Sequence, residues 1–236
     1  MNPEHISPRK DIVALIPEGT ISVLDVGCAE ATMFQELRNK GVTYYCGIDI
    51  INTPEFLSLI KPRLDRYIHC DLNRTVTFPF KDEEFDVIIF GDILEHVFDP
   101  WSVLERFVRH LKPNGTIIIS IPNSLLHYSA FRKIITGTHS YQSSGLWDNT
   151  HIRFFSRRMV LGMINKAGLE VVKYVPNYEY DPWIMEKKPI LMAMFNQILK
   201  FICFGSADKE TVNMEDMDDF YVIQFVYTVK KKKVSQ

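Results

Sequence analysis

The sequence has no long hydrophobic run, no cysteine pair at metal-binding spacing and no strong excess of either charge. No stretch reaches the roughly 18 uninterrupted apolar residues of a membrane span, and the start lacks the basic and apolar segments of a signal peptide. The formal charge of −2 gives no general attraction to nucleic acid; we interpret the basic run at Lys230 to Lys233 as a solvated terminus. The four cysteines show no C-x-x-C spacing, which suits a reducing compartment. We therefore expect a soluble cytoplasmic protein without a nucleic-acid partner.

What the sequence does contain is a buried strand pattern that stops on a glycine. Residues 23–31 read Val-Leu-Asp-Val-Gly-Cys-Ala-Glu-Ala. A strand that ends on Gly27 can turn sharply, bring bare backbone against a ligand and direct the N-terminus of the next helix at it. The dinucleotide fingerprint G-x-G-x-x-G would require glycine where this chain has Ala29 and Ala31. The turn therefore predicts a nucleotide-like cofactor without naming it.

Short apolar, β-branched runs alternate with helical patterns over the first half of the chain. This alternation predicts an α/β fold with a doubly wound, mostly parallel sheet and right-handed crossovers. We expect strands at 21–26, 44–49, 66–70, 85–90 and 116–121, and helices at 32–40, 55–60 and 100–111. Asp99 is the expected N-cap of the last helix, and Lys112-Pro113-Asn114-Gly115 is expected to stop it.

The last third of the chain has a different organisation. A helix over 156–167 leads into a strand at 169–175, and a second strand is expected at 220–229. We interpret these two strands as an antiparallel pair that completes a seven-stranded sheet. The segment between them, about 176–219, is too long for a hairpin loop. It predicts a helical insertion in what is otherwise a single domain over residues 1–236.

The apolar segment Ile190 to Phe204 is the expected helix of this insertion. We expect its apolar surface to pack on its own domain or on a second copy of the chain, as a homodimer. The alternatives are a substrate lid and a helix that lies in a membrane interface, with Lys200 extended toward the head groups.

Acidic residues follow the second and third predicted strands. Asp49 lies about 20 residues beyond the glycine turn, where a carboxylate can accept hydrogen bonds from both hydroxyls of a ribose. Asp71 follows the third strand, where a carboxylate could reach an adenine amino group while Leu72 packs on the ring. Because ligands of doubly wound sheets bind beyond the carboxyl ends of the strands, these residues together predict a site.

The segment from Phe80 to Asn123 completes an ordered set of motifs. The set comprises Asp25-Val26-Gly27-Cys28, Asp49, Asp71, Phe85-Asp86-Val87-Ile88, Asp92-Ile93-Leu94-Glu95-His96 and Leu111-Lys112-Pro113-Asn114-Gly115. With these motifs the chain resembles the class I S-adenosylmethionine-dependent methyltransferases over about residues 20–175. The resemblance implies the family's fold and its sulfonium cofactor, with the methionine end over Gly27, the ribose on Asp49 and the adenine near Asp71. The implied cofactor-binding residues are Asp25, Gly27, Cys28, Ala29, Asp49, Ile50, Asp71, Leu72, Gly91, Asp92 and Ile93.

Ala29 and Ala31 depart from relatives that often carry glycine at these positions. We expect their methyl groups to need slightly more room but no positive φ, so that the loop shifts and cofactor binding survives. A relative that has lost the cofactor and serves as a non-catalytic scaffold is the alternative.

Within the family, the chain is most similar to small-molecule O-methyltransferases, including those that act on sugars and glycans. This similarity lies in residues 92–96, 120–123 and 148–155. An acceptor hydroxyl must lose its proton during transfer, and a histidine of near-neutral pKa suits that task. His96 and His151 are the candidate bases, and Asp148 would orient His151 or bind sugar hydroxyls. Helix capping by His96 and a structural hydrogen bond from His151 are the competing interpretations.

The same region also resembles the divalent-ion site of small-RNA 2′-O-methyltransferases, and Glu95-His96 is similar to some quinone-precursor O-methyltransferases. Such ligands suit Mg²⁺ or Mn²⁺, which would lower the pKa of the acceptor hydroxyl. The metal ligands, if any, would be Asp92, Glu95, His96 and His151. We favour the metal-free alternative because Glu-His after the fourth strand also occurs in metal-free relatives. A metal-dependent RNA 2′-O-methyltransferase is the alternative function, and the near-neutral charge argues against it.

Overall fold

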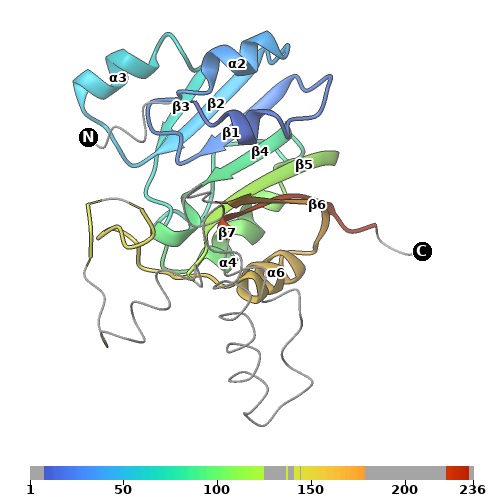
Figure 1. The fold of residues 1–236 in the computed structure, drawn as a ribbon. Coiled ribbons are helices and arrows are strands. Elements are labelled where there is room, and N and C mark those ends of the chain that lie inside the picture. Colours follow the sequence, from blue (N-terminus) through green and yellow to red (C-terminus); the bar gives the residue numbers. More distant parts are fainter. Residues whose placement is uncertain (1–7, 125–136, 138–140, 144, 179–221, 234–236) are drawn as a thin grey trace, which may run out of the picture.

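A seven-stranded sheet in the order β3-β2-β1-β4-β5-β7-β6 forms the centre of the molecule (Figure 1). The computed structural model describes residues 8–124, 137, 141–143, 145–178 and 222–233. The strands are β1 (Ser22–Val26), β2 (Tyr44–Asp49), β3 (Arg66–His69), β4 (Phe85–Gly91), β5 (Leu111–Pro122), β6 (Leu169–Tyr178) and β7 (Val222–Lys231). β7 runs antiparallel to β5 and β6, and the other neighbours are parallel. The predicted α/β fold with its antiparallel edge pair is confirmed.

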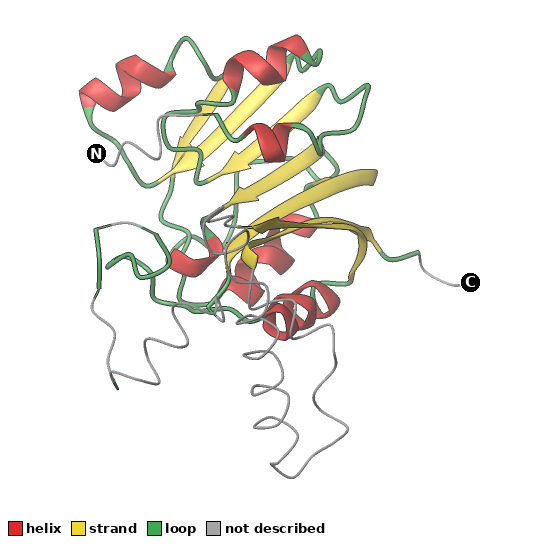
Figure 2. Ribbon diagram, in the orientation of Figure 1, coloured by secondary structure: helices red, strands yellow, loops and turns green. Residues whose placement is uncertain are grey.

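Helices cover both faces of this sheet (Figure 2). The helices α1 (Lys10–Val13), α2 (Phe34–Asn39) and α3 (Pro54–Ile60) contribute to one apolar cluster, and α4 (Pro100–Val108) and α6 (Arg157–Lys166) to the other. A short 3₁₀ helix, η2 (Leu94–His96), follows β4. The arrangement is the doubly wound one that the alternating pattern predicts.

The starts of three helices are capped by the side chain that precedes them. In each, a hydroxyl or carboxylate oxygen accepts a backbone N–H from three residues further on. The pairs are Thr53 with Phe56 at 3.3 Å, Asp99 with Ser102 at 3.1 Å and Ser156 with Met159 at 3.4 Å. The predicted Asp99 cap is thus confirmed, and it fixes the point where the loop after β4 enters α4.

β4 separates the two apolar cores. Phe85, Ile88 and Phe90 face the cluster of α4 and α6, whereas Val87 and Ile89 face the cluster of α1, α2 and α3. All five side chains are fully buried, as expected for a strand covered on both faces. Such a strand holds the loop at its carboxyl end in a fixed place.

β5 begins earlier than the sequence indicates. The helix expected over 100–111 ends at Val108, and residues 112–115 lie within β5 rather than in a turn. Leu111 pairs with Phe85, and the register shifts before Val87. A Cβ on Gly115 would lie 2.9 Å from the carbonyl oxygen of Asp86, so close strand approach requires glycine there. The predicted boundary was wrong because a turn-like sequence is used to enter a strand beside a bulge.

β6 lies at the edge of the sheet and extends beyond the expected end at residue 175. Its register against β7 shifts between Val171 and Lys173, and it contains Pro176. The rest of the expected insertion, including the predicted helix over 190–204, lies outside the described residues.

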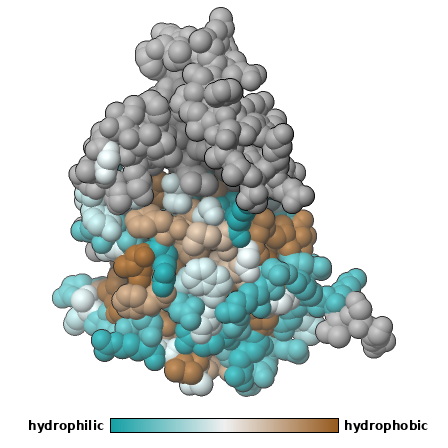
Figure 3. Space-filling model, turned by 90° about the horizontal axis from the view of Figure 1, so that it is seen from below, coloured by the Kyte–Doolittle hydropathy of each residue, from teal (hydrophilic) through white to brown (hydrophobic). Residues whose placement is uncertain are grey.

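Some apolar side chains reach the surface. Met159 and Leu161 of α6 are exposed, and the view from below shows apolar patches among hydrophilic residues (Figure 3). None of the helices in the described part of the chain is long and apolar enough to cross a membrane.

Candidate active site

The loop after β1 is shaped by a glycine and by backbone hydrogen bonds. Gly27 has a φ of 78°, and the N–H groups of Gly27 and Cys28 both donate to the carbonyl of Ile48, at 2.8 and 3.0 Å. A Cβ on Gly27 would lie 2.7 Å from the side chain of Ile93, which packs here from the loop after β4. Both the backbone conformation and the lack of space therefore require glycine at this turn.

Ala29 and Ala31 adopt the left-handed conformation, with φ of 41° and 52°. The expectation that they need no positive φ was wrong. For alanine this conformation costs roughly 1–2 kcal/mol per residue, so surrounding contacts must hold it. The N–H of Ala29 donates to Oδ2 of Asp49 at 2.9 Å, and Ala31 is fully buried. The loop makes the turns that glycine would make, and packing maintains them.

Asp49 ends β2 directly beside this loop. One carboxylate oxygen accepts the N–H of Ala29 at 2.9 Å, and the other accepts that of Ile51 at 3.1 Å. Ile50, which lies between Asp49 and Ile51 in the sequence, is 61% exposed. The structure thus brings Asp49 to the glycine turn, as its spacing in the sequence indicates.

Asp25 and Cys28, two of the expected cofactor ligands, have buried side chains. The hydroxyl of Tyr45 donates to Oδ2 of Asp25 at 2.7 Å, and burial raises the pKa of Asp25 to about 7. Burial also raises the pKa of the Cys28 thiol. A Cβ on Gly47 would lie 2.6 Å from Sγ of Cys28, so this sulfur is packed against β2. Both side chains support the loop from within the core.

The loop after β3 folds around Asp71. Its Oδ1 accepts the N–H of Asn73 at 2.9 Å, and its Oδ2 lies 3.3 Å from Nε of Arg74. Leu72 is buried in the core that includes α4, and Arg106 of α4 donates to its carbonyl at 3.3 Å. Leu72 therefore anchors the loop, while the carboxylate of Asp71 stays partly exposed.

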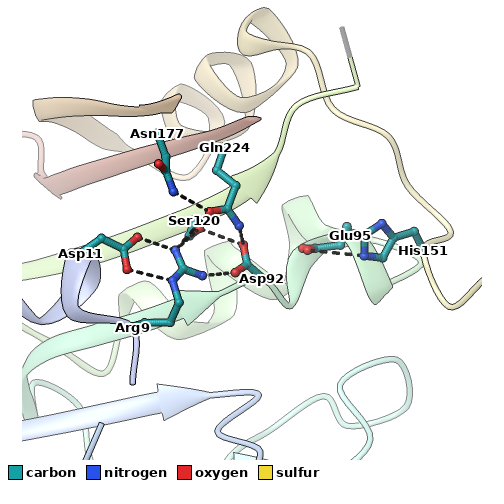
Figure 4. Close-up of polar contacts among 8 residues, drawn as sticks. All are labelled: Arg9, Asp11, Asp92, Glu95, Ser120, His151, Asn177 and Gln224. Carbon is teal, nitrogen blue, oxygen red and sulfur yellow. Dashed lines mark hydrogen bonds and ion pairs between the residues drawn. The ribbon is translucent and has the colours of Figure 1, made fainter. Parts of the chain in front are cut away.

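Asp92 follows Gly91, the last residue of β4, and has a φ of 60°. Its carboxylate accepts hydrogen bonds from Ser120 Oγ at 2.8 Å and Gln224 Nε2 at 2.9 Å, and it forms an ion pair with Arg9 (Figure 4). This network joins the start of the chain to the ends of β4 and β5 and to β7.

Arg9 is a site residue that the sequence did not reveal. Its guanidinium also pairs with Asp11 at 2.7 Å and donates to Ser120 Oγ at 3.0 Å. Burial opposes its charge, but Asp11 and Asp92 outweigh this effect and raise the pKa of Arg9. No spacing or periodicity in the sequence links Arg9 to Asp92, so only the fold brings the pair together.

Glu95 and His96 of η2 meet His151, which lies in the loop before α6. One nitrogen or oxygen atom of each lies within 4.8 Å of the others, and the imidazole centroids are 4.7 Å apart. Oε1 of Glu95 lies 3.9 Å from Nε2 of His151 (Figure 4). Glu95 is 1% exposed, and its carboxylate has no hydrogen-bond partner in the described part of the chain. Burial raises the pKa of Glu95; burial and His151 lower the pKa of His96.

Backbone carbonyls orient both imidazoles. Nδ1 of His96 lies 3.1 Å from the carbonyl of Thr150, and Nδ1 of His151 lies 2.9 Å from that of Leu146. Since a carbonyl only accepts, each Nδ1 carries the proton, and each Nε2 keeps its lone pair when the ring is neutral. The carboxylate of Asp148 accepts from Thr150 N–H at 2.8 Å and from its hydroxyl at 2.6 Å. Asp148 therefore shapes the turn, whereas Leu146 holds the ring of His151.

Comparison with known proteins identifies the family. A family model described as a methyltransferase domain matches residues 5–174. The ubiquinone biosynthesis O-methyltransferase of Pasteurella multocida is 32% identical over 174 residues, which are 68% of this chain and 69% of that protein.

The chain belongs to the class I S-adenosylmethionine-dependent methyltransferases. It is an enzyme, and S-adenosylmethionine is its cofactor, as the motifs implied. A S-adenosylmethionine-dependent methyltransferase of Archaeoglobus fulgidus shares the fold, with a TM-score of 0.60 at 17% identity over 91% of this chain and 87% of that one. The 1,6-didemethyltoxoflavin-N1-methyltransferase of Burkholderia thailandensis, solved with S-adenosylhomocysteine, gives a TM-score of 0.55 at 13% identity over 95% and 78%.

The histidine cluster of this methyltransferase has a donor set that fits a divalent cation. The imidazoles of His96 and His151 and the buried carboxylate of Glu95, which has no hydrogen-bond donor among the described residues, offer ligand atoms within 4.8 Å of one another, and the carbonyls on Nδ1 fix the ring orientations, as is usual for metal-binding histidines. Asp92, the fourth ligand expected from the sequence, is instead held by Arg9. The Nε2 atom of either imidazole could equally accept a proton from an acceptor hydroxyl.

Proposed function

We propose that this methyltransferase transfers the methyl group of S-adenosylmethionine to a hydroxyl oxygen of a small molecule in the cytoplasm. The observation that carries the proposal is the cluster of Glu95, His96 and His151 in the loops that follow β4 and precede α6. A relative that is an O-methyltransferase of ubiquinone biosynthesis favours a phenolic hydroxyl, and sugar or glycan hydroxyls are the alternative acceptors.

The cofactor is proposed to lie along the loops after β1, β2 and β3. Its methionine end would lie at Gly27, its ribose at Asp49 and its adenine between Ile50 and Asp71. Ile50 supports this placement because it is an exposed apolar residue next to Asp49, the residue proposed to bind the ribose, and so offers a surface for the adenine ring.

Arg9 and Asp92 are proposed to bind the two charges of the methionine end. A guanidinium matches a carboxylate and a carboxylate matches an ammonium group, so each member of this ion pair is complementary to one end of the amino-acid zwitterion. Arg9 and Asp92 meet where β4 and β5 end, and Ile93, which follows Asp92, packs on Gly27.

His96 or His151 is proposed to remove the proton of the acceptor. Methyl transfer is an in-line displacement, so the acceptor oxygen must approach the methyl carbon while its proton leaves. Nε2 of either ring can take this proton because each Nδ1 donates to a carbonyl. Burial lowers the pKa of His96, which favours the neutral, proton-accepting form at neutral pH.

A second candidate, metal-assisted O-methylation, is favoured by the buried carboxylate of Glu95. Glu95, His96 and His151 would hold Mg²⁺ or Mn²⁺, and the cation would supply a lower pKa for a bound acceptor hydroxyl. Extensive dialysis against EDTA distinguishes the two candidates. Turnover that survives dialysis supports histidine base catalysis, and turnover restored only by Mn²⁺ supports the metal.

A substrate panel tests the proposed function itself. S-adenosylhomocysteine production should be measured with catechols and other phenols, nucleotide sugars and capped RNA-like oligonucleotides, alongside calorimetric titration of S-adenosylmethionine. Turnover of a phenol or sugar hydroxyl supports the proposal. Turnover of RNA alone, or cofactor binding with methylation at nitrogen or carbon, would contradict it.

A further inference from the structure

Both backbone polar groups of Phe98 are held by side chains from two other loops. Its N–H donates to Oδ1 of Asn73 at 2.7 Å, and its carbonyl accepts from Nε of Arg153 at 3.0 Å. Phe98 is 65% exposed, so these backbone hydrogen bonds, rather than packing of the ring, fix its position. Three loops, after β3, after β4 and before α6, therefore meet at one residue between His96 and α4.

Asn73 belongs to the same turn as Asp71. The N–H of Asn73 donates to Oδ1 of Asp71 at 2.9 Å, and the N–H of Thr75 donates to the carbonyl of Asp71 at 2.9 Å. Arg106 ties this turn to α4 independently, through the carbonyls of Leu72 and Thr75. The side-chain amide of Asn73 therefore links this turn to the loop after β4. If that link is removed, Arg106 still holds the turn.

Arg153 stands at the other side of Phe98, on the loop that carries His151. Its own N–H and that of Ile152 both donate to the carbonyl of Glu95, each at 3.0 Å. The side chain of Arg153 adds a hydrogen bond to the carbonyl of Phe98, three residues after Glu95. Removing that side chain keeps the backbone hydrogen bonds to Glu95 but breaks the link between Phe98 and the loop that carries His151.

We propose that Asn73 and Arg153 are positioning residues that couple the cofactor's adenine side to the Glu95, His96 and His151 cluster. The proposal rests on the proposed cofactor placement and on the cation-binding capacity of the cluster. A ligand that orders the Asp71 turn also holds the side chain of Asn73, which binds the main chain of Phe98. Phe98 in turn binds the side chain of Arg153, and this contact restricts the loop that carries His151. The second ligand then meets a site that is already ordered, and each ligand strengthens the binding of the other.

Calorimetric titration of Mn²⁺ into the full chain, with and without saturating S-adenosylhomocysteine, measures this coupling. We expect about fivefold tighter Mn²⁺ binding in the presence of S-adenosylhomocysteine. In Asn73→Ala and Arg153→Ala the ratio should fall close to one, while S-adenosylhomocysteine still binds. Asn73→Asp keeps an oxygen acceptor for Phe98 N–H and should retain the coupling. Arg109→Ala, which removes an exposed ion pair with Asp82 near the start of β4, is the matched control.

The outcomes separate this inference from its premises. An unchanged ratio in both alanine variants, or no coupling in the parent chain, overturns the inference alone. Absence of Mn²⁺ binding in the parent chain overturns the inference together with the metal candidate, but not the cofactor placement. Absence of S-adenosylhomocysteine binding in the parent chain overturns the proposed function as well.

Discussion

Arg9 forms an ion pair with Asp92, so a residue before the first helix reaches the carboxyl end of the central strand. The pair is part of a partly buried network in which Ser120 and Gln224 donate to the same carboxylate. Hydrogen bonds between charged partners in such surroundings are stronger than neutral ones, and a carboxylate left without its cation is costly. The pair therefore has both a structural and a binding consequence.

Arg9→Ala should weaken S-adenosylmethionine binding by at least tenfold in calorimetric titration. It removes the proposed partner of the methionine carboxylate and leaves Asp92 without its cation. Arg109→Ala is the matched control, since it also removes an arginine from an ion pair, but from an exposed one. Equal affinity of Arg9→Ala and the parent chain would refute the proposed role of Arg9.

Ala29→Gly should raise the free energy of unfolding by up to about 1 kcal/mol. Glycine adopts the observed φ of 41° without steric cost, although its greater freedom in the unfolded state offsets part of the gain. Ala31→Gly should gain less, because it also removes a fully buried methyl group. Urea denaturation of the two variants measures the difference, and an Ala29→Gly protein no more stable than the parent chain would show that strain at residue 29 is unimportant.

Asp25→Asn should flatten the dependence of stability on pH between about 4 and 7. The folded-state pKa of Asp25 is raised to about 7 by burial, whereas an unfolded aspartate titrates near 3.9. The folded protein then binds the extra proton, so this group lowers stability as pH rises, by at most about 1.4 kcal/mol per pH unit. Above pH 7 the loss is complete. Thermal denaturation of variant and parent from pH 4 to 8 should give curves that diverge as pH rises; parallel curves would contradict the shifted pKa.

If the metal candidate holds, Glu95→Gln should abolish turnover, because it removes the carboxylate that would help to hold the cation. Because burial raises the pKa of Glu95, its side chain is neutral in the metal-free protein at neutral pH, so the amide should change the melting temperature of that form little. Any increase in melting temperature that Mn²⁺ gives the parent chain should disappear. Glu105→Gln, on an exposed glutamate that faces Lys166, controls for the loss of charge. A less stable Glu95→Gln protein with normal turnover would mean that Glu95 is structural.

The fold could be predicted because its strands are buried on both faces and read as continuous apolar runs. Between Phe85 and Phe90 the apolar side chains fill both cores, so this run is too short and too uniformly apolar to be anything but a buried strand between two layers of helices. The beginning of β5 could not be predicted, since Lys112-Pro113-Asn114-Gly115 has turn chemistry and only the bulge in its pairing with β4 makes it a strand. Local signals describe local conformation, and here a long-range pairing overrides them.

The candidate site, like the fold, could be predicted from the sequence only in part. Asp49 reaches the glycine turn, and His96 meets His151, because strand order places the loops of adjacent strands at one edge. The partner of Asp92 could not be read from the sequence, since Arg9 precedes it by 83 residues and belongs to no motif. The positive φ of Ala29 could not be predicted, because alanine does not signal this conformation as a glycine would.

The bulge and Pro176 in β6 bear on how two copies of the chain could associate. An exposed edge strand invites a second strand to pair with it, but a displaced register and a residue without an N–H interrupt the ladder that such pairing needs. A continuous fourteen-stranded sheet across two copies is therefore disfavoured at this edge. Apart from the opposite edge at β3, a homodimer would have to use the helical faces or the loops, where association changes the surroundings of the acceptor rather than the length of the sheet.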